Sequence, residues 1–138
     1  REVAVIGGGH VGLEVAHFLC ANNKVTIVEM ADEIGASVYY ITKFKLLPLL
    51  REAGVTFRTG QAIAAVDDGS IRLRDTHTGQ CTELKAEAVV LAMGSRPDLA
   101  ARAAFDRNFD HVVYAGDAVR GGTMLEANRD AFALAWEF

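Results

Sequence analysis

The chain has 138 residues, of which 51% are hydrophobic, and a formal net charge of −4 at pH 7. That length and composition suit one domain with one sizeable core. The acidic balance, with its Lys and Arg residues scattered, excludes the basic patch that a nucleic acid or an anionic membrane would require. No apolar stretch approaches the roughly 20 residues of a membrane span, and no signal peptide precedes the first expected strand, so we expect a cytoplasmic protein.

A glycine-rich turn follows the first expected strand, which runs over residues 3–6 as an uninterrupted apolar segment. The turn reads G-x-G-x-x-G, with its glycines at Gly7, Gly9 and Gly12. In a dinucleotide site the first glycine permits a tight turn, the second lets the backbone approach a pyrophosphate, and the third lets the next helix pack closely on its strand. We expect that helix to begin near His10 and to direct unpaired N–H groups at the phosphates.

The second expected strand, residues 24–28, ends at an acidic residue, Glu29. Glu29 lies near the spacing of about 20 residues at which such sites place the acid that binds the adenosine ribose. A carboxylate there accepts hydrogen bonds from both ribose hydroxyls and repels a 2′-phosphate, which favours NAD(H) over NADP(H). Strand, turn, helix and acid together predict an adenine-dinucleotide site, although this pattern alone leaves both NAD and FAD open.

A helical stripe over residues 10–21 and a second helix over residues 40–53 flank a loop at residues 31–38. Pro48 should kink the second helix or mark a restart, and Gly54 should stop it. Residues 55–58 predict a third strand, which completes a β-α-β-α-β half of a doubly wound fold.

The hydrophobic period then changes to alternation. Residues 62–66, 70–74 and 81–85 form short alternating runs separated by Asp-Asp-Gly and Thr-His-Thr-Gly turn signals. These runs predict a three-stranded antiparallel meander. Residues 88–92 then predict another buried strand that leads into Gly94.

The last part of the chain contains a charged connection, a short apolar run at residues 112–115 and an amphipathic stretch at residues 123–138. We interpret the connection, which includes Arg102 and Asp106, as solvated, the apolar run as a strand and the final stretch as a helix. An apolar strand left unpaired is an aggregation hazard, so we expect residues 112–115 to join the parallel sheet or to pair with another chain. The overall prediction is an α/β fold: a Rossmann-like parallel sheet with flanking helices and a three-stranded antiparallel β-meander.

The remaining reactive side chains show no site spacing. Cys20 and Cys81 are isolated, without a redox pair or an iron–sulfur pattern, and we interpret them as ordinary thiols. His17, His77 and His111 are scattered without metal-ligand spacing, and we interpret them as surface residues. The sequence therefore predicts no metal site and assigns no catalytic residue.

Four segments carry a family resemblance: Val-Ala-Val-Ile-Gly-Gly-Gly-His-Val-Gly-Leu-Glu, Val-Thr-Ile-Val-Glu-Met, Val-Val-Leu-Ala-Met-Gly-Ser-Arg-Pro and Tyr-Ala-Gly-Asp-Ala-Val. Together they resemble the NAD(P)H-binding domain of FAD- and NAD(P)-dependent pyridine-nucleotide oxidoreductases. Within that superfamily the chain is most similar to the C-terminal region of NADH:flavin oxidoreductases of the old-yellow-enzyme and 2,4-dienoyl-CoA reductase type.

The resemblance implies that the glycine loop is the second of two, with Gly7, Gly9 and Gly12 at the NAD pyrophosphate and Glu29 at the ribose. Gly94 would let the nicotinamide half pass the end of its strand, and Asp117 would accept hydrogen bonds from the ribityl-phosphate region of FAD. The resulting set of cofactor-binding residues is Gly7, Gly9, His10, Val11, Gly12, Glu29, Met30, Met93, Gly94 and Asp117. Glu14 falls where similar reductases keep an acid near the nicotinamide, and a structural role on the helix face fits it equally well.

The first FAD loop of such proteins is absent from these 138 residues, and the chain opens directly on a strand without an initiator Met. We therefore expect a piece of a longer polypeptide. Residues 1–98 would form the NAD(H)-binding domain, and residues 99–138 would supply a connection, strand and helix that return into an FAD domain, all within one compact unit.

Two functions stay open. The first is an NADH-dependent flavin oxidoreductase whose flavin-binding remainder is the partner of this chain, with FAD in the full-length protein and hydride transfer as the reaction. The second is an autonomous module that binds NAD(H) or ADP in a sensing or structural role. The presence of Glu29 favours the first, and a homodimer is compatible with either.

Overall fold

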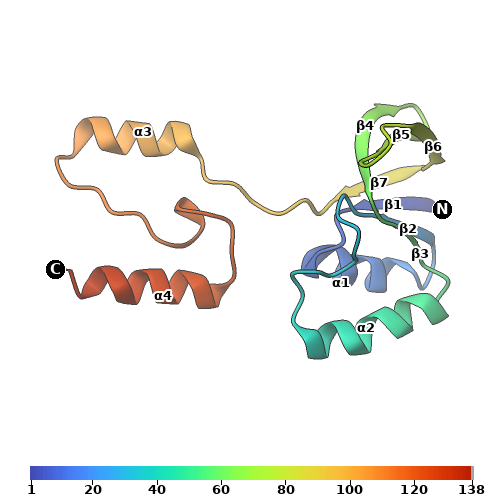
Figure 1. The fold of residues 1–138 in the computed structure, drawn as a ribbon, viewed down its shortest axis with the longest axis horizontal. Coiled ribbons are helices and arrows are strands. Elements are labelled where there is room, and N and C mark those ends of the chain that lie inside the picture. Colours follow the sequence, from blue (N-terminus) through green and yellow to red (C-terminus); the bar gives the residue numbers. More distant parts are fainter. Residues whose placement is uncertain (138) are drawn as a thin grey trace. The chain divides into compact units, whose positions relative to one another are not determined.

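A computed structural model describes residues 1–137 of the chain (Figure 1). Contacts divide the chain into two compact units, where we expected one: unit 1 spans Arg1–Met93, and unit 2 begins at Gly94. The division falls a few residues before the expected boundary at residue 98. Within the part that the structure describes, no helix is long and apolar enough to cross a membrane.

A four-stranded parallel sheet forms the centre of unit 1. Its strands are β1 (Glu2–Ile6), β2 (Lys24–Val28), β3 (Thr56–Arg58) and β7 (Ala88–Leu91), in the order β3-β2-β1-β7. The register places Val5 of β1 between Ile27 of β2 and Val90 of β7. Both central strands are buried over four successive residues, as expected where both faces of a sheet are covered.

Two helices cover one face of this sheet, α1 (His10–Leu19) and α2 (Tyr40–Glu52). Leu13 and Ala16 of α1 and Leu50 of α2 are completely buried against Val5 and Ile27 of the sheet. Pro48 lies inside α2, and the helix continues through it without the restart that the sequence allowed.

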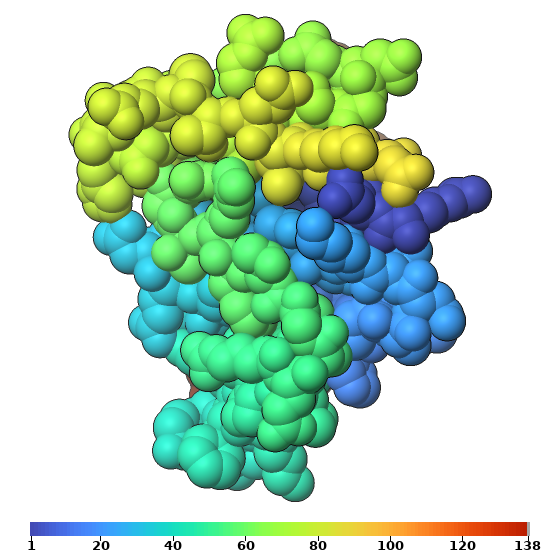
Figure 2. All heavy atoms as spheres, turned by 90° about the vertical axis from the view of Figure 1, so that its right-hand side faces the viewer, coloured from blue at the N-terminus to red at the C-terminus, as the bar shows by residue number. Residues whose placement is uncertain are grey.

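A three-stranded antiparallel sheet covers the other face. It consists of β4 (Gln61–Asp67), β5 (Ser70–Asp75) and β6 (Cys81–Lys85), in that order, which confirms the predicted meander. Ile71 and Leu73 of β5 are fully buried with Ala4, Ile6 and Val28 of the parallel sheet. Figure 2 shows these layers from the side, with the yellow-green antiparallel strands above the blue parallel strands and the teal α2 below. The α/β fold predicted from the sequence is therefore confirmed.

Unit 2 contains α3 (Leu99–Asn108), the short 3₁₀ helix η1 (Gly116–Ala118) and α4 (Met124–Ala135). α3 was not predicted, since this segment was interpreted only as a solvated connection; it is a helix, and none of its residues is buried. Asp98 caps it by accepting hydrogen bonds from the N–H groups of Ala100 and Ala101, both at 3.0 Å, and alanines with high helix propensity follow.

Residues 112–115 also differ from the prediction, because they form no strand and join no sheet. A strand needs a hydrogen-bonded partner, and unit 2 offers none among its described residues. The hydroxyl of Tyr114 in this segment instead has two acceptors within hydrogen-bond distance, the carbonyl oxygen of Arg102 at 2.9 Å and Oδ1 of Asp106 at 2.8 Å. The final helix is confirmed over Met124–Ala135. It ends earlier than expected, because residues 136–137 form a turn, and residue 138 lies outside the described residues.

Candidate functional site

The glycine turn joins β1 to α1 through two close backbone approaches. Gly7 has a φ of +110°, and a Cβ atom there would lie 2.2 Å from the carbonyl oxygen of Ala92. A Cβ atom on Gly12 would lie 1.9 Å from the carbonyl oxygen of Gly7. Both glycines are therefore required by the packing of the chain itself, whether or not a ligand is present.

Gly9 differs from these two glycines. It has an ordinary negative φ of −77°, and the nearest atom to an added Cβ would be Oγ of Ser37 at 4.0 Å. The protein's own packing thus leaves space in front of the Gly9 backbone. Because neither its φ nor a neighbouring atom requires a glycine at this position, Gly9 fits a site where a ligand approaches the main chain.

The N-terminus of α1 is open. Gly9 is its N-cap and offers no side chain, and no acidic residue occupies the first turn. Among residues 1–137, the N–H of Leu13 is the first in this helix that has an acceptor within the protein: it donates to the carbonyl oxygen of the N-cap residue Gly9 at 3.0 Å. The N–H groups of His10, Val11 and Gly12 are consequently left for an external acceptor, at the positive end of the helix dipole. This arrangement fits a phosphate or another anion.

Glu29 lies directly beside this turn, although it is 21 positions away from Gly8 in the sequence. Its Oε2 accepts the N–H of Gly8 at 2.6 Å, and its Oε1 accepts the N–H of Ala31 at 2.8 Å. Both bonds hold the half-buried carboxylate in one orientation. A carboxylate has about four acceptor positions, so two remain for donors such as ribose hydroxyls.

Two further glycines, Gly8 and Gly35, contribute backbone hydrogen bonds at this turn, and the sequence interpretation assigned a role to neither. Gly8 donates to Glu29 and accepts the N–H of Gly35 at 2.9 Å, so both of its backbone polar groups are used. A Cβ on Gly8 would lie 2.9 Å from Cδ1 of Ile34 and 3.1 Å from Cβ of Glu29. The run of three consecutive glycines was the available signal for Gly8, whereas nothing in the sequence points to its contact with Gly35.

The other predicted residues are divided between the two units. His10, Val11, Met30 and Met93 are exposed in unit 1, and Nε2 of His10 lies 3.1 Å from Oε1 of Glu14. Gly94 and Asp117 belong to unit 2. The structure therefore brings together the glycine loop and Glu29 within unit 1, whereas Gly94 and Asp117 lie in unit 2.

Asp117 already has partners within unit 2. Its Oδ2 accepts a hydrogen bond from Oγ of Ser95 at 3.3 Å, and its Oδ1 accepts one from the N–H of Gly122 at 3.2 Å. Gly116, the preceding residue, has a φ of +58° and donates its N–H to Oδ2 of Asp130 at 3.2 Å. The Gly-Asp pair thus forms a local, hydrogen-bonded turn before α4.

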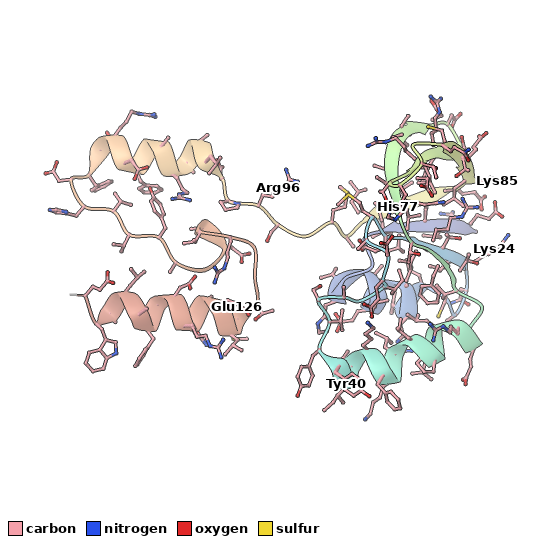
Figure 3. All side chains as sticks on the ribbon, viewed as in Figure 1. Lys24, Tyr40, His77, Lys85, Arg96 and Glu126 are labelled. Carbon is pink, nitrogen blue, oxygen red and sulfur yellow. The ribbon has the colours of Figure 1, made fainter. Side chains whose placement is uncertain are left out.

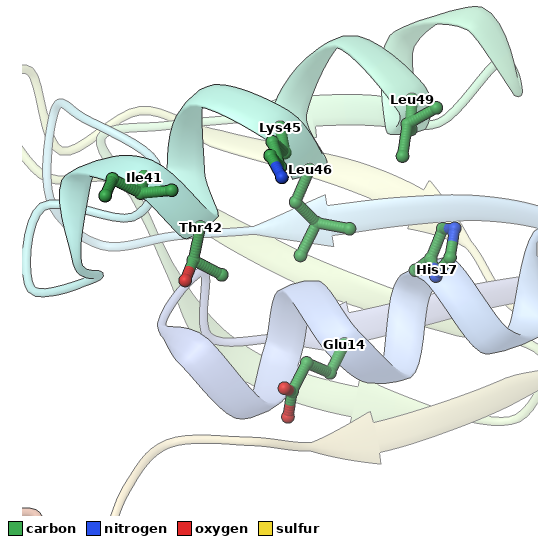
Figure 4. Close-up of a pocket in the computed structure, with 7 residues that line it drawn as sticks. All are labelled: Glu14, His17, Ile41, Thr42, Lys45, Leu46 and Leu49. Atoms are coloured by element: carbon green, nitrogen blue, oxygen red, sulfur yellow. The ribbon is translucent and has the colours of Figure 1, made fainter.

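An open groove of about 600 Å³ runs between α1 and α2 (Figure 4). Leu46, Ile41 and Leu49 supply its apolar part, while Glu14 and Lys45 supply charges of opposite sign. None of its lining residues belongs to the glycine turn. Its position on the helices, away from Gly7–Gly12, excludes it as the pyrophosphate site.

Comparisons with known proteins show the family to which the chain belongs. Residues 1–114 match the family model of the pyridine nucleotide-disulphide oxidoreductases. The NADH oxidase of Thermoanaerobacter brockii is 33% identical over 140 residues, which cover 99% of this chain and 21% of that protein. A ferredoxin–NAD(+) reductase component of the p-cumate 2,3-dioxygenase system of Pseudomonas putida is 37% identical over 102 residues, which cover 72% of this chain and 24% of that protein.

Solved structures support the fold. Histamine dehydrogenase from Rhizobium sp. 4-9 aligns with 100% of this chain and 23% of its own, at a TM-score of 0.79 and 19% identity. A 2-naphthoyl-CoA reductase aligns with 99% of this chain and 21% of its own, at a TM-score of 0.78 and 22% identity. The chain thus spans about a fifth to a quarter of the length of these similar proteins. With a family match over residues 1–114, the chain belongs to the pyridine nucleotide-disulphide oxidoreductase family, an oxidoreductase family that uses NAD(H) and FAD.

Proposed function

We propose that this chain is the NADH-binding part of a flavin-dependent oxidoreductase of the NADH:flavin, old-yellow-enzyme type. The observation that carries the proposal is the Glu29 carboxylate, fixed by the N–H groups of Gly8 and Ala31 beside an open helix N-terminus. Anion-binding N–H groups and an oriented ribose acceptor occur together, as a dinucleotide requires.

In this proposal each part of unit 1 has one task. The N–H groups at the start of α1 bind the pyrophosphate, and Gly9 leaves room for it. Glu29 accepts the two adenosine ribose hydroxyls and repels a 2′-phosphate. Met30 and Met93 border the site, and Gly94 and Asp117 act in the longer protein near the nicotinamide and the flavin. The bound nicotinamide would supply a hydride for a flavin held by the remainder of the polypeptide.

The names of the relatives favour NADH as the donor. One is an NADH oxidase and another is a ferredoxin–NAD(+) reductase component. The subgroup assignment is supported by the segments Val-Glu-Met, Leu-Ala-Met-Gly-Ser-Arg-Pro and Gly-Asp-Ala-Val.

The alternative function is a module that binds NAD(H) or ADP without passing electrons. The closed core of unit 1 favours it, because this unit buries both faces of its sheet with its own residues. One measurement on the full-length protein, the visible spectrum after addition of NADH, distinguishes the two functions. NADH should bleach a bound flavin if the chain serves a flavoprotein, and should leave the visible spectrum unchanged if the chain is a module.

Calorimetric titration of the chain with NADH and NADPH tests the binding itself. We expect tighter binding of NADH, and we expect Glu29→Ala to reduce the difference between the two nucleotides. Glu52→Ala, which removes an exposed carboxylate at the end of α2, is the matched control and should keep the wild-type preference. Equal affinities in the wild-type chain, or no binding, would refute the NAD(H) assignment.

A further inference from the structure

The loop that carries Glu29 is fastened to the antiparallel sheet of unit 1. The carbonyl oxygen of Ala31 accepts the N–H of Gly60 at 2.9 Å. The carbonyl oxygen of Gly60 in turn accepts the N–H of Thr76 at 2.8 Å and its hydroxyl at 3.0 Å. Two hydrogen-bonded steps therefore join the residue that fixes Glu29 to the turn between β5 and β6.

A side-chain pair makes a second connection between the same two segments. Nε2 of His77, in the β5–β6 turn, lies 2.6 Å from Oδ1 of Asp32, in the loop after Glu29 (His77 is labelled in Figure 3). Gly60 lies beside this pair, since a Cβ there would be 3.3 Å from Oδ1 of Asp32 and 3.5 Å from Cδ2 of His77. Asp32 and His77 are 45 positions apart in the sequence. Their side chains join the same two segments that the backbone hydrogen bonds of Ala31, Gly60 and Thr76 join.

The turn that presents His77 is itself ordered. Oδ1 of Asp75 accepts the N–H of His77 at 3.0 Å, the N–H of Thr78 at 2.7 Å and the hydroxyl of Thr78 at 3.0 Å. Such a side-chain-to-backbone turn fixes the residues that it encloses. His77 thus lies in a turn that is held by hydrogen bonds to Asp75, while Asp32 belongs to a loop without regular secondary structure.

The charges around His77 favour its protonated form. Asp32 faces it from the loop after β2, and Asp75 faces it from its own turn. The hydrogen bond and charge of Asp32 raise the pKa of His77 above its ordinary value, Asp75 adds to this effect, and partial burial opposes it. An imidazolium makes a stronger, charge-assisted hydrogen bond to a carboxylate than a neutral imidazole does.

We propose that His77 is a positioning residue for the nucleotide: through Asp32 it holds the Glu29 loop in the conformation that binds ribose, and it thereby links NADH binding to a proton. This inference rests on the proposed function, because it requires that Glu29 binds the nucleotide. A preorganised loop loses less conformational entropy on binding, so a stronger Asp32–His77 pair gives tighter binding. The bound state therefore favours protonated His77, and affinity for NADH falls as the pH rises through the raised pKa of His77.

The size of the effect is limited by exposure. The side chains of His77 and Asp32 are 64% and 74% exposed, and an exposed ion pair changes an equilibrium by about two- to fivefold. We expect NADH to bind the wild-type chain about two- to fivefold more weakly at pH 8.5 than at pH 6 through this pair. Reciprocity requires that saturating NADH raises the pKa of His77 by the corresponding amount.

The test measures NADH affinity by calorimetry between pH 6 and pH 8.5 for the wild-type chain, His77→Gln, Asp32→Asn and a matched control, His111→Gln. His111 is an exposed residue of unit 2, so its variant should keep the wild-type pH profile. His77→Gln and Asp32→Asn should each flatten the profile, and the double variant should add nothing further. An NMR titration of the His77 ring with and without NADH measures the reciprocal effect.

The outcomes separate the two proposals. If the variants bind NADH with the wild-type pH dependence, or if NADH leaves the pKa of His77 unchanged, the role of His77 is refuted while the proposed function stands. If the wild-type chain binds no NADH at any pH, both proposals fail. Thermal unfolding of each variant verifies that the exposed substitutions leave the fold intact.

Discussion

Units 1 and 2 are held together in different ways. In unit 1 a parallel sheet is covered on both faces, and side chains such as Leu13, Ile27 and Leu50 are completely buried. In unit 2 none of the described residues is buried, and Phe132 and Trp136 are 67% and 78% exposed. Unit 1 is therefore specified by its core, whereas the helices of unit 2 are specified by local interactions.

The helix N-termini show the same contrast. α3 is capped by Asp98, and α4 has a capping box in which Thr123 and Glu126 satisfy each other's backbone donors. α1 has no capping side chain, and its N-cap is Gly9. Helices that satisfy their own N–H groups need no ligand, whereas α1 and α2 of unit 1 both lack a capping side chain. Of these two, α1 begins at the glycine turn beside Glu29, so its N–H groups are the ones placed to bind the anion of a dinucleotide.

The largest expected effect is on the free energy of unfolding, and it distinguishes the buried side chains of unit 1 from the exposed side chains of unit 2. Leu50→Ala removes a fully buried side chain from unit 1 and should lower its free energy of unfolding by about 2–5 kcal/mol. Phe132→Ala removes a larger side chain from α4, but this side chain is exposed, and the free energy of unfolding of unit 2 should change by less than about 0.5 kcal/mol. Hydrogen exchange in urea of the β1 and β2 amides measures unit 1, and that of the α4 amides measures unit 2. Similar losses in the two variants would contradict the difference between the units.

The second prediction divides the glycines of the turn into structural and ligand-facing residues. Gly12→Ala places a Cβ against the carbonyl oxygen of Gly7 and should cost unit 1 about 1–3 kcal/mol, with weaker NADH binding as a consequence. A Cβ on Gly9 would meet only Oγ of Ser37, at 4.0 Å and without a clash, so Gly9→Ala should cost less than about 1 kcal/mol. It should nevertheless weaken NADH binding by about tenfold, because the new methyl group occupies the space for the pyrophosphate.

Unfolding and NADH titration of both variants check this division. An affinity loss for Gly9→Ala without a loss of stability supports a ligand at the Gly9 backbone. If Gly9→Ala binds NADH as the wild type does, the open space in front of α1 is not the pyrophosphate site.

The difference between the units also explains what the sequence could predict. Strands buried on both faces are continuous apolar runs, so β1 and β2 were recognisable, and the alternation of β4–β6 predicted the meander. β7 is also an apolar run, but the expectation that it is buried was wrong: it is an edge strand, and Leu91 is 65% exposed. Gly7, Gly9, Gly12 and Glu29 follow a local spacing that encodes their proximity. In unit 2 the apolar run at residues 112–115 has no partner strand among residues 1–137, and a strand depends on its partner rather than on its own residues.

Other features were missed because their signals are weak or distant in sequence. The start of α3 was marked by Asp98 before an alanine-rich segment, but the charged residues within that segment were interpreted as a solvated connection. The bond between Gly8 and Gly35 and the pair of Asp32 with His77 join loops through tertiary contacts. No residue spacing encodes such contacts, and only the folded chain reveals them.

The smallest effect should come from the capping box of α4. Thr123→Ala removes the hydroxyl that accepts the N–H of Leu125 at 3.3 Å and also loses its bond to Glu126. A lost N-cap costs about 1 kcal/mol, and α4 has no buried residue to compensate for it, so its N-terminal turn should fray. Hydrogen exchange of the first-turn amides should become faster, whereas NADH affinity should stay unchanged. A change in affinity would show that unit 2 contributes to the nucleotide site, and it would weaken the distinction between a self-satisfied α4 and a ligand-binding α1.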